Sequence, residues 1–176
     1  TYRPGTSPVR DDSLPILAMG GTLRARIEVA GAPASGIICA LGDRNGGYAL
    51  YCLDGRLTFA LAVGSEPVAA RANAELAPGE HEVAATLAPT DDGGATITVT
   101  VDDHPVASTA APLGIPFAFQ HGGTALRLGS DTGFPVHDDY RCPFPWNGTI
   151  ADVTISSAMG FDTGRGPSVD DSLHAD

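Results

Sequence analysis

The feature that most constrains the fold is a series of short segments in which apolar and polar side chains alternate with a period of two. In residues 95–101, Ile97, Val99 and Val101 alternate with threonines, as expected for a strand with one buried face. Asp54-Gly55 is typical of a two-residue β-hairpin turn, because both central positions of a type I′ turn need a positive φ angle. We therefore expect strands over residues 22–29, 36–41, 48–53, 56–63, 80–87, 95–101, 105–108, 117–119, 125–128 and 148–155.

Two segments need separate interpretation. Residues 66–76 contain helix-forming side chains but are short and end at Pro78-Gly79, so we interpret them as a strand followed by a loop. In the last strand, the alternation predicts that Ala151, Val153 and Ile155 face the core. Because no convincing amphipathic helix is present, the sequence predicts an all-β, two-sheet antiparallel jelly-roll sandwich.

Length and composition predict one folded domain between two less regular ends. A chain of 176 residues that is 43% hydrophobic is long enough to bury a core. We expect a linker over residues 1–21, the β-sandwich over 22–156 and an acidic, disordered tail over 157–176.

The charge argues against two classes of partner. All basic residues are arginines, and 10 of them stand against 21 acidic residues, giving a net charge of −11. Binding to nucleic acid or to an anionic membrane surface needs clustered Lys and Arg, so we expect neither partner. No signal peptide or transmembrane segment is visible in this soluble chain, and a bacterial cytoplasmic or an exported location both stay open.

An irregular stretch between the last two strands holds most of the candidate site residues. Trp146, Tyr140, Phe144 and Phe134 lie in it, together with His137. Loops of this length in compact domains are often functional. The aromatic rings would either stack on a sugar, or close the end of the sandwich and form an interface with another domain.

The same loop carries a cluster of acidic residues. Asp131, Asp138 and Asp139 offer the oxygen ligands that calcium prefers, so calcium is a candidate cofactor. The alternative is that these side chains accept hydrogen bonds from loop amides. His137 beside Asp138 suggests an acid–base pair, but the sequence places no nucleophile nearby, so a solvated histidine is the alternative.

Three cysteines are present, and none belongs to a zinc-binding pattern. Cys39 and Cys52 flank the turn at residues 42–47, and counting outward from it places them nearly opposite each other on two antiparallel strands. Facing residues there are close enough for a disulfide. The alternative is two free thiols in the core.

Two runs of sequence resemble a known family. GIICALGDRNGGYALYCLDGRLTFAL is similar to a hairpin pair in the C-terminal domain of a large group of bacterial arylsulfatases, and LRLGSDTGFPVHDDYRCPFPWNGTIADVTI resembles that domain's GxDTGxPVxxDY…PFxxxGTI segment. The resemblance covers roughly residues 1–156 and implies a concanavalin-like or laminin-G-like β-sandwich. Cys39 and Cys52 depart from the aliphatic residues that the family has at these positions, which favours the disulfide.

The chemistry of that family is missing from this chain. A sulfatase needs a Cys or Ser in a C/S-x-P-x-R motif, and the sequence around Cys142, Cys-Pro-Phe-Pro, has neither the spacing nor the arginine. Our first hypothesis is a non-catalytic domain that packs on a sulfatase catalytic domain, or forms an oligomer, through the loop around 131–146. The second is a carbohydrate-binding module that uses the aromatic loop 134–146. The third is a concanavalin-like glycan-acting enzyme, which would need two converging acidic residues among Glu28, Glu66, Glu75, Glu80 and Glu82.

Overall fold

A computed structural model describes residues 1–15, 17–31, 33–64, 66–114 and 125–158 of the chain. Its elements are two short 3-10 helices, η1 (Pro4–Thr6) and η2 (Asp11–Ser13), and the strands β1 (Val9–Arg10), β2 (Gly21–Val29), β3 (Gly36–Asp43), β4 (Gly46–Leu53), β5 (Arg56–Val63), β6 (Val68–Arg71), β7 (Gly79–Pro89), β8 (Ala95–Val101), β9 (His104–Ala111), β10 (Ala125–Leu128) and β11 (Thr149–Ser157). No helix in these described ranges has the length and apolar character needed to cross a membrane.

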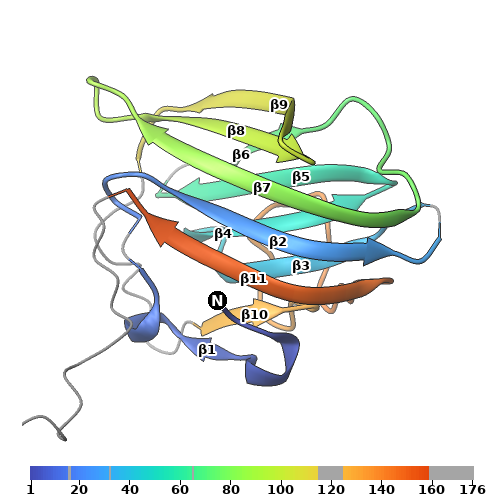
Figure 1. The fold of residues 1–176 in the computed structure, drawn as a ribbon. Coiled ribbons are helices and arrows are strands. Elements are labelled where there is room, and N and C mark those ends of the chain that lie inside the picture. Colours follow the sequence, from blue (N-terminus) through green and yellow to red (C-terminus); the bar gives the residue numbers. More distant parts are fainter. Residues whose placement is uncertain (16, 32, 65, 115–124, 159–176) are drawn as a thin grey trace, which may run out of the picture.

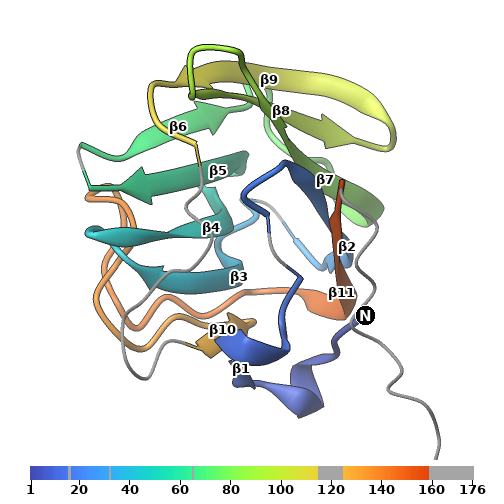
Figure 2. The same cartoon turned by 90° about the vertical axis from the view of Figure 1, so that its left-hand side faces the viewer.

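The strands form two antiparallel sheets packed face to face, which confirms the predicted two-sheet jelly-roll sandwich. One sheet has the order β1-β10-β3-β4-β5-β6 and the other β11-β2-β7-β8-β9. Figures 1 and 2 show the two layers, with β6 and β9 on the same flank. The main core lies between the sheets and includes Leu23, Leu50, Phe59, Ile97 and Leu126.

Period-two alternation located most strands accurately. β5, β8 and β10 have the bounds expected from the sequence, and residues 66–76 contain the short strand β6 followed by a loop. Asp54 and Gly55 have φ angles of 50° and 77°, so the hairpin turn has the predicted positive-φ backbone. The strand expected over 117–119 lies outside the described residues, as does the tail from residue 159 onward.

The prediction that Ala151 faces the core was wrong. The register of β11 against β2 shifts between Ile150 and Asp152, so one extra residue is inserted at this point. Ile150, Val153 and Ile155 are buried, while Ala151 is exposed on the outer face. A bulge reverses the alternation, and sequence periodicity alone gives no sign of it.

The assumption that Cys39 and Cys52 face each other was also wrong. β3 pairs Cys39 with Leu50, and Cys52 with Gly36, because the register shifts between Ile37 and Cys39. Both cysteines are free and buried in the main core. Burial raises the pKa of each thiol to about 12.

The first 21 residues contribute to the sandwich. Tyr2 forms an antiparallel bridge with Val153 of β11, through N–O contacts of 2.7 and 2.8 Å. Leu14 and Leu17 are buried in the main core. The linker boundary at residue 22 stays a prediction, but the described part of this segment packs as an edge of the domain.

Candidate functional site

The stretch that the sequence analysis singled out is folded back onto the sandwich. Residues 129–148, which we call the covering loop, lie across the outer face of the six-stranded sheet (Figure 2, orange). Val136 and Tyr140 of the loop form a second buried cluster with Ile37, Tyr51 and other outward residues of β3, β4 and β5. This sheet is therefore apolar on both faces, which explains why β4 reads GGYALYCL without clear alternation.

Asp139 fastens the middle of the covering loop to the sheet. Its carboxylate accepts a hydrogen bond of 2.7 Å from the hydroxyl of Tyr51 and forms an ion pair with Arg71 of β6. His137 Nδ1 lies 2.9 Å from Asp139 Oδ1. Burial, followed by the bond to Asp139, raises the pKa of Tyr51, so this hydroxyl remains a donor.

Asp131 holds the loop together from within. Only 3% of the residue is exposed, and its Oδ2 accepts a hydrogen bond of 3.0 Å from the hydroxyl of Tyr140. The same hydroxyl accepts the backbone N–H of Val136 at 2.9 Å, and Asp131 Oδ1 accepts that of Gly133 at 3.2 Å. Burial and the Asp131 carboxylate raise the pKa of the nearby Cys142 thiol to about 12, which keeps it protonated.

The three aspartates of the calcium hypothesis point to different partners. Asp138 forms an ion pair with Arg44 at 3.1 Å, whereas Asp131 and Asp139 are bonded to tyrosines as described above. Within the described residues, no group of three His, Cys, Asp or Glu side chains is arranged to hold a metal ion. The geometry favours the alternative role as internal hydrogen-bond acceptors, and calcium binding stays an untested prediction.

The aromatic residues of the loop do not form one open platform. Tyr140 is buried, and its ring centroid lies 5.0 Å from that of Tyr51 and 5.5 Å from that of Phe144. Trp146 is half-buried and packs against the main core. Phe134 alone of these loop aromatics is largely exposed, at 79%. The structure therefore brings Tyr140 and Phe144 together and leaves Phe134 as a separate apolar tip.

Backbone contacts also fix the second half of the loop. The N–H of Ile37 donates to the carbonyl of Phe144 at 3.1 Å, and the N–H of Trp146 donates to Gly129 at 2.9 Å. Gly36, with φ of +117°, allows this approach, since a Cβ atom there would lie 2.1 Å from the Pro145 carbonyl oxygen. The loop is thus bonded to the start of β3 as well as packed on the face of the sheet.

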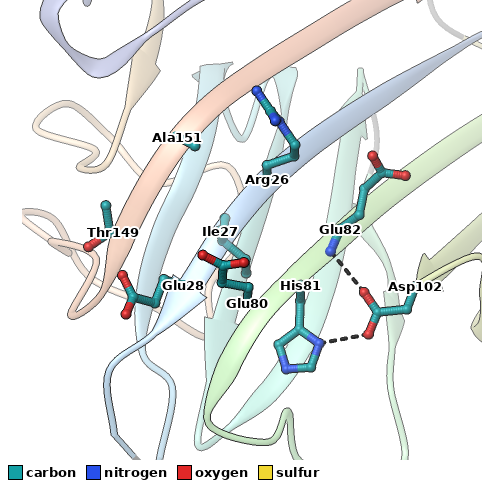
Figure 3. A pocket seen from close by; sticks show the side chains of 9 residues that line it. All are labelled: Arg26, Ile27, Glu28, Glu80, His81, Glu82, Asp102, Thr149 and Ala151. Carbon is teal, nitrogen blue, oxygen red and sulfur yellow. Dashed lines mark hydrogen bonds and ion pairs between the residues drawn. The ribbon is translucent and has the colours of Figure 1, made fainter.

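A second candidate site lies on the five-stranded sheet (Figure 3). The sequence analysis named three of its residues, Glu28, Glu80 and Glu82, only as available acidic residues and did not place them together. The site is a depression of about 350 Å³ at one end of the sheet. Glu28 and Glu80 are direct cross-strand partners there, and no hydrogen bond or ion pair within the described residues engages either carboxylate. The lining residues are Arg26, Ile27, Glu28, Glu80, His81, Glu82, Asp102, Thr149 and Ala151.

His81 closes one side of this depression. Its Nδ1 lies 2.8 Å from Asp102 Oδ2, and its Nε2 lies 2.9 Å from the carbonyl oxygen of Ala77. Because both nitrogens lie at hydrogen-bond distance from oxygen atoms, the ring is held in place on two sides. Asp102 also accepts the backbone N–H of Glu82 at 2.9 Å, so it joins β7 to the β8–β9 turn.

Sequence reasoning missed the residues of the sheet that hold the covering loop. Tyr51 and Arg71 bind Asp139, and Arg44 binds Asp138. One signal for Tyr51 was available, because a large aromatic residue on the face opposite the core indicates a second covered surface. The pairing of Glu28 with Glu80 had no such signal, since it depends on the register of two strands far apart in the chain.

Comparisons with known proteins show the fold. Neither protein-family models nor curated protein sequences gave a match. Among solved structures, this chain is similar to the mouse laminin alpha1 chain domains LG4-5, with a TM-score of 0.61, 17% identity, and coverage of 85% of this chain and 38% of that one. A native heptameric SAP-like pentraxin from Limulus polyphemus has a TM-score of 0.52 and 20% identity, covering 81% of this chain and 65% of that chain.

The third comparison is with a bacterial protein. The Ruminococcus gnavus IT-sialidase CBM40 bound to alpha2,3 sialyllactose has a TM-score of 0.58 and 14% identity, covering 88% of this chain and 83% of that one. The chain spans well under two thirds of the laminin chain and just under two thirds of the pentraxin. At these identities the comparisons show a laminin-G-like and concanavalin-like β-sandwich, and they assign no ligand to this chain.

Proposed function

We propose that this chain is a non-catalytic accessory domain of an arylsulfatase-like protein, and that the covering loop packs on the catalytic domain. The observation that carries the proposal is the exposed ring of Phe134, at 79%, on a loop whose three aspartates and Tyr140 are bonded within the domain. A large apolar side chain presented by a fixed loop is a typical anchor for a protein partner.

The electrostatics of the loop support an interface in preference to catalysis. The carboxylates of Asp131, Asp138 and Asp139 are each engaged by a tyrosine or an arginine. His137 contacts Asp139, and no cysteine or serine of the sequence lies in a C/S-x-P-x-R motif. A preformed loop of this kind loses little conformational entropy when it docks.

Site-specific crosslinking tests this proposal directly. Phe134 is replaced by a photo-crosslinking phenylalanine analogue in the protein expressed in its native cell, and the linked peptides are identified by mass spectrometry. We expect linked peptides from a polypeptide or domain that contains the C/S-x-P-x-R motif.

A matched variant carries the same analogue at Asp91, an exposed residue of the turn between β7 and β8. This position should give no link to the motif-containing region. Crosslinking of Phe134 only to a second copy, or to no protein at all, would overturn docking on a sulfatase catalytic domain.

Carbohydrate binding is the second candidate function, and the depression of Figure 3 favours it. The depression has a volume of about 350 Å³, and the carboxylates at its lining can accept hydrogen bonds from several sugar hydroxyls. The unpaired carboxylates of Glu28 and Glu80 would repel an anionic sugar, so we propose a neutral glycan and not a sialylated one. No aromatic residue lines the depression, and both glutamates are exposed, so the arrangement does not favour glycan hydrolysis.

A glycan array with neutral and sialylated oligosaccharides tests this second candidate. Binding of neutral glycans should disappear in the double variant Glu28→Ala with Glu80→Ala. Glu66→Ala with Asp91→Ala removes the same charge from exposed positions away from the depression and should bind normally. A preference for sialylated glycans, or no binding to any glycan, would refute the hypothesis.

A further inference from the structure

Within the described residues the two sheets have four edge strands, and three of these strands are short or partly covered. β1 contains 2 residues and β6 contains 4. β11 is longer, but the N-terminal segment pairs with it through Tyr2 and Val153. Natural sheets commonly shorten or cover their edges in these ways to prevent pairing with other chains.

β9 is the exception. It contains 8 residues and forms the outer edge of the five-stranded sheet, where it pairs with β8 alone among the described strands. β6 of the other sheet packs on the same flank without pairing with it (Figures 1 and 2). Pro105 and the register shift between Val99 and Thr100 affect only its first residues. The stretch from Ala107 to Ala111, beyond the bulge at Val106, therefore presents a regular row of backbone donors and acceptors.

The side chains of this stretch suit a close approach. Residues 105–111 read PVASTAA and carry no charge, in a chain whose net charge is −11. Ser108 and Ala110 are the exposed outer-face residues, and both are small. The Ser108 hydroxyl donates to the carbonyl of Ile97 at 3.0 Å, so it needs no partner from another chain. Leu113, which follows the strand, is 48% exposed and adds apolar surface at its end.

We propose that β9 is a self-association edge, at which two copies of this chain pair β9 with β9 in antiparallel orientation. The five-stranded sheets then join into one sheet that runs across both copies. A two-fold axis of this kind makes the contact isologous, so it closes after two copies.

The charge distribution favours a second copy as the occupant. The acidic turn Asp102–Asp103 precedes β9, and the uncharged residues Pro112 and Leu113 follow it. Antiparallel pairing places the start of one β9 opposite the end of the other, so each acidic turn lies beside uncharged residues. Pairing at β9 therefore keeps the two acidic turns apart in a chain whose net charge is −11.

Mass measurement over a range of concentrations tests the proposal. In size-exclusion chromatography with multi-angle light scattering, the wild-type chain should approach twice its monomer mass of 17.9 kDa as concentration rises. The double variant Ser108→Lys with Ala110→Lys should stay monomeric, because the two-fold axis places added positive charges close to each other. Circular dichroism checks that each variant is folded.

The matched control is Thr98→Lys with Thr100→Lys, which adds the same charge to the neighbouring inner strand β8 and should dimerise like wild type. A wild-type chain that stays monomeric at the highest concentration, or a β9 variant that still dimerises, overturns the proposal. Neither result bears on docking of the covering loop, which is read from crosslinks at Phe134.

Discussion

At the scale of single residues, Tyr140 shows how the covering loop is held. Its hydroxyl donates to the buried carboxylate of Asp131 and accepts the backbone N–H of Val136. Both partners are buried, so the loss of one oxygen atom leaves a donor and an acceptor unsatisfied.

Replacement of Tyr140 by Phe should therefore lower the free energy of unfolding by about 1–3 kcal/mol. Urea denaturation of the variant and the wild type measures this difference. Phe134→Leu is the matched control, and we expect it to change stability by less than about 0.5 kcal/mol because the ring is exposed. Equal stability of Tyr140→Phe and the wild type would show that this hydroxyl does not fasten the loop.

Asp102 gives a prediction about pH. The hydrogen bond from His81, followed by that from the Glu82 amide, lowers its pKa below the ordinary 3.8. A carboxyl with a lower pKa in the folded state stabilises the protein above pH 3.8, and this contribution is lost as pH falls further.

The melting temperature of Asp102→Asn should therefore lie below that of the wild type by a constant amount above about pH 5, and the difference should shrink below about pH 4. Thermal unfolding followed by circular dichroism between pH 2 and pH 6, with Asp91→Asn as control, measures it. A difference that stays constant down to pH 2 would contradict the role given to the contact with His81.

At the scale of elements, the register between β3 and β4 decides the state of two cysteines. The bulge near Ile38 moves Cys39 opposite Leu50, so Cys39 and Cys52 are both buried without facing each other. Hydrophobic patterns place strands well, but register depends on turns and bulges that a single sequence does not reveal.

Two observations should follow from this register. A thiol reagent at neutral pH should leave Cys39 and Cys52 unmodified in the folded protein and label both after unfolding, because burial raises their pKa values to about 12. A reducing agent should leave the melting temperature unchanged. A drop in melting temperature on reduction, or a mass 2 Da below that of the fully reduced chain, would restore the disulfide hypothesis.

At the scale of the whole molecule, the N-terminal segment closes the sandwich. Leu14 and Leu17, which precede the expected domain boundary at residue 22, belong to the main core. Tyr2 pairs with Val153 on the edge of β11. The sandwich therefore uses a segment whose sequence, rich in Pro, Gly and Ser, resembles a linker.

Leu17→Ala should lower the free energy of unfolding by about 2–5 kcal/mol, as expected for a buried leucine in a packed core. Chemical denaturation measures the change, and Met19→Ala, at a position that is 49% exposed, serves as control. If Leu17→Ala were as stable as the wild type, the segment would be a linker attached to an independent domain.

The sequence by itself determined the fold class, because alternation with a period of two and the turn at Asp54-Gly55 are local signals that the backbone obeys within a few residues. It also indicated that residues 129–148 are special, since they combine acidic and aromatic side chains. Only the tertiary structure decided what those side chains contact. The bonds of Asp139 to Tyr51 and Arg71, the opposition of Glu28 and Glu80, and the free edge of β9 join or expose residues far apart in the chain. Such contacts depend on sheet order and register, which are fixed by packing of the whole sandwich and not by any local pattern.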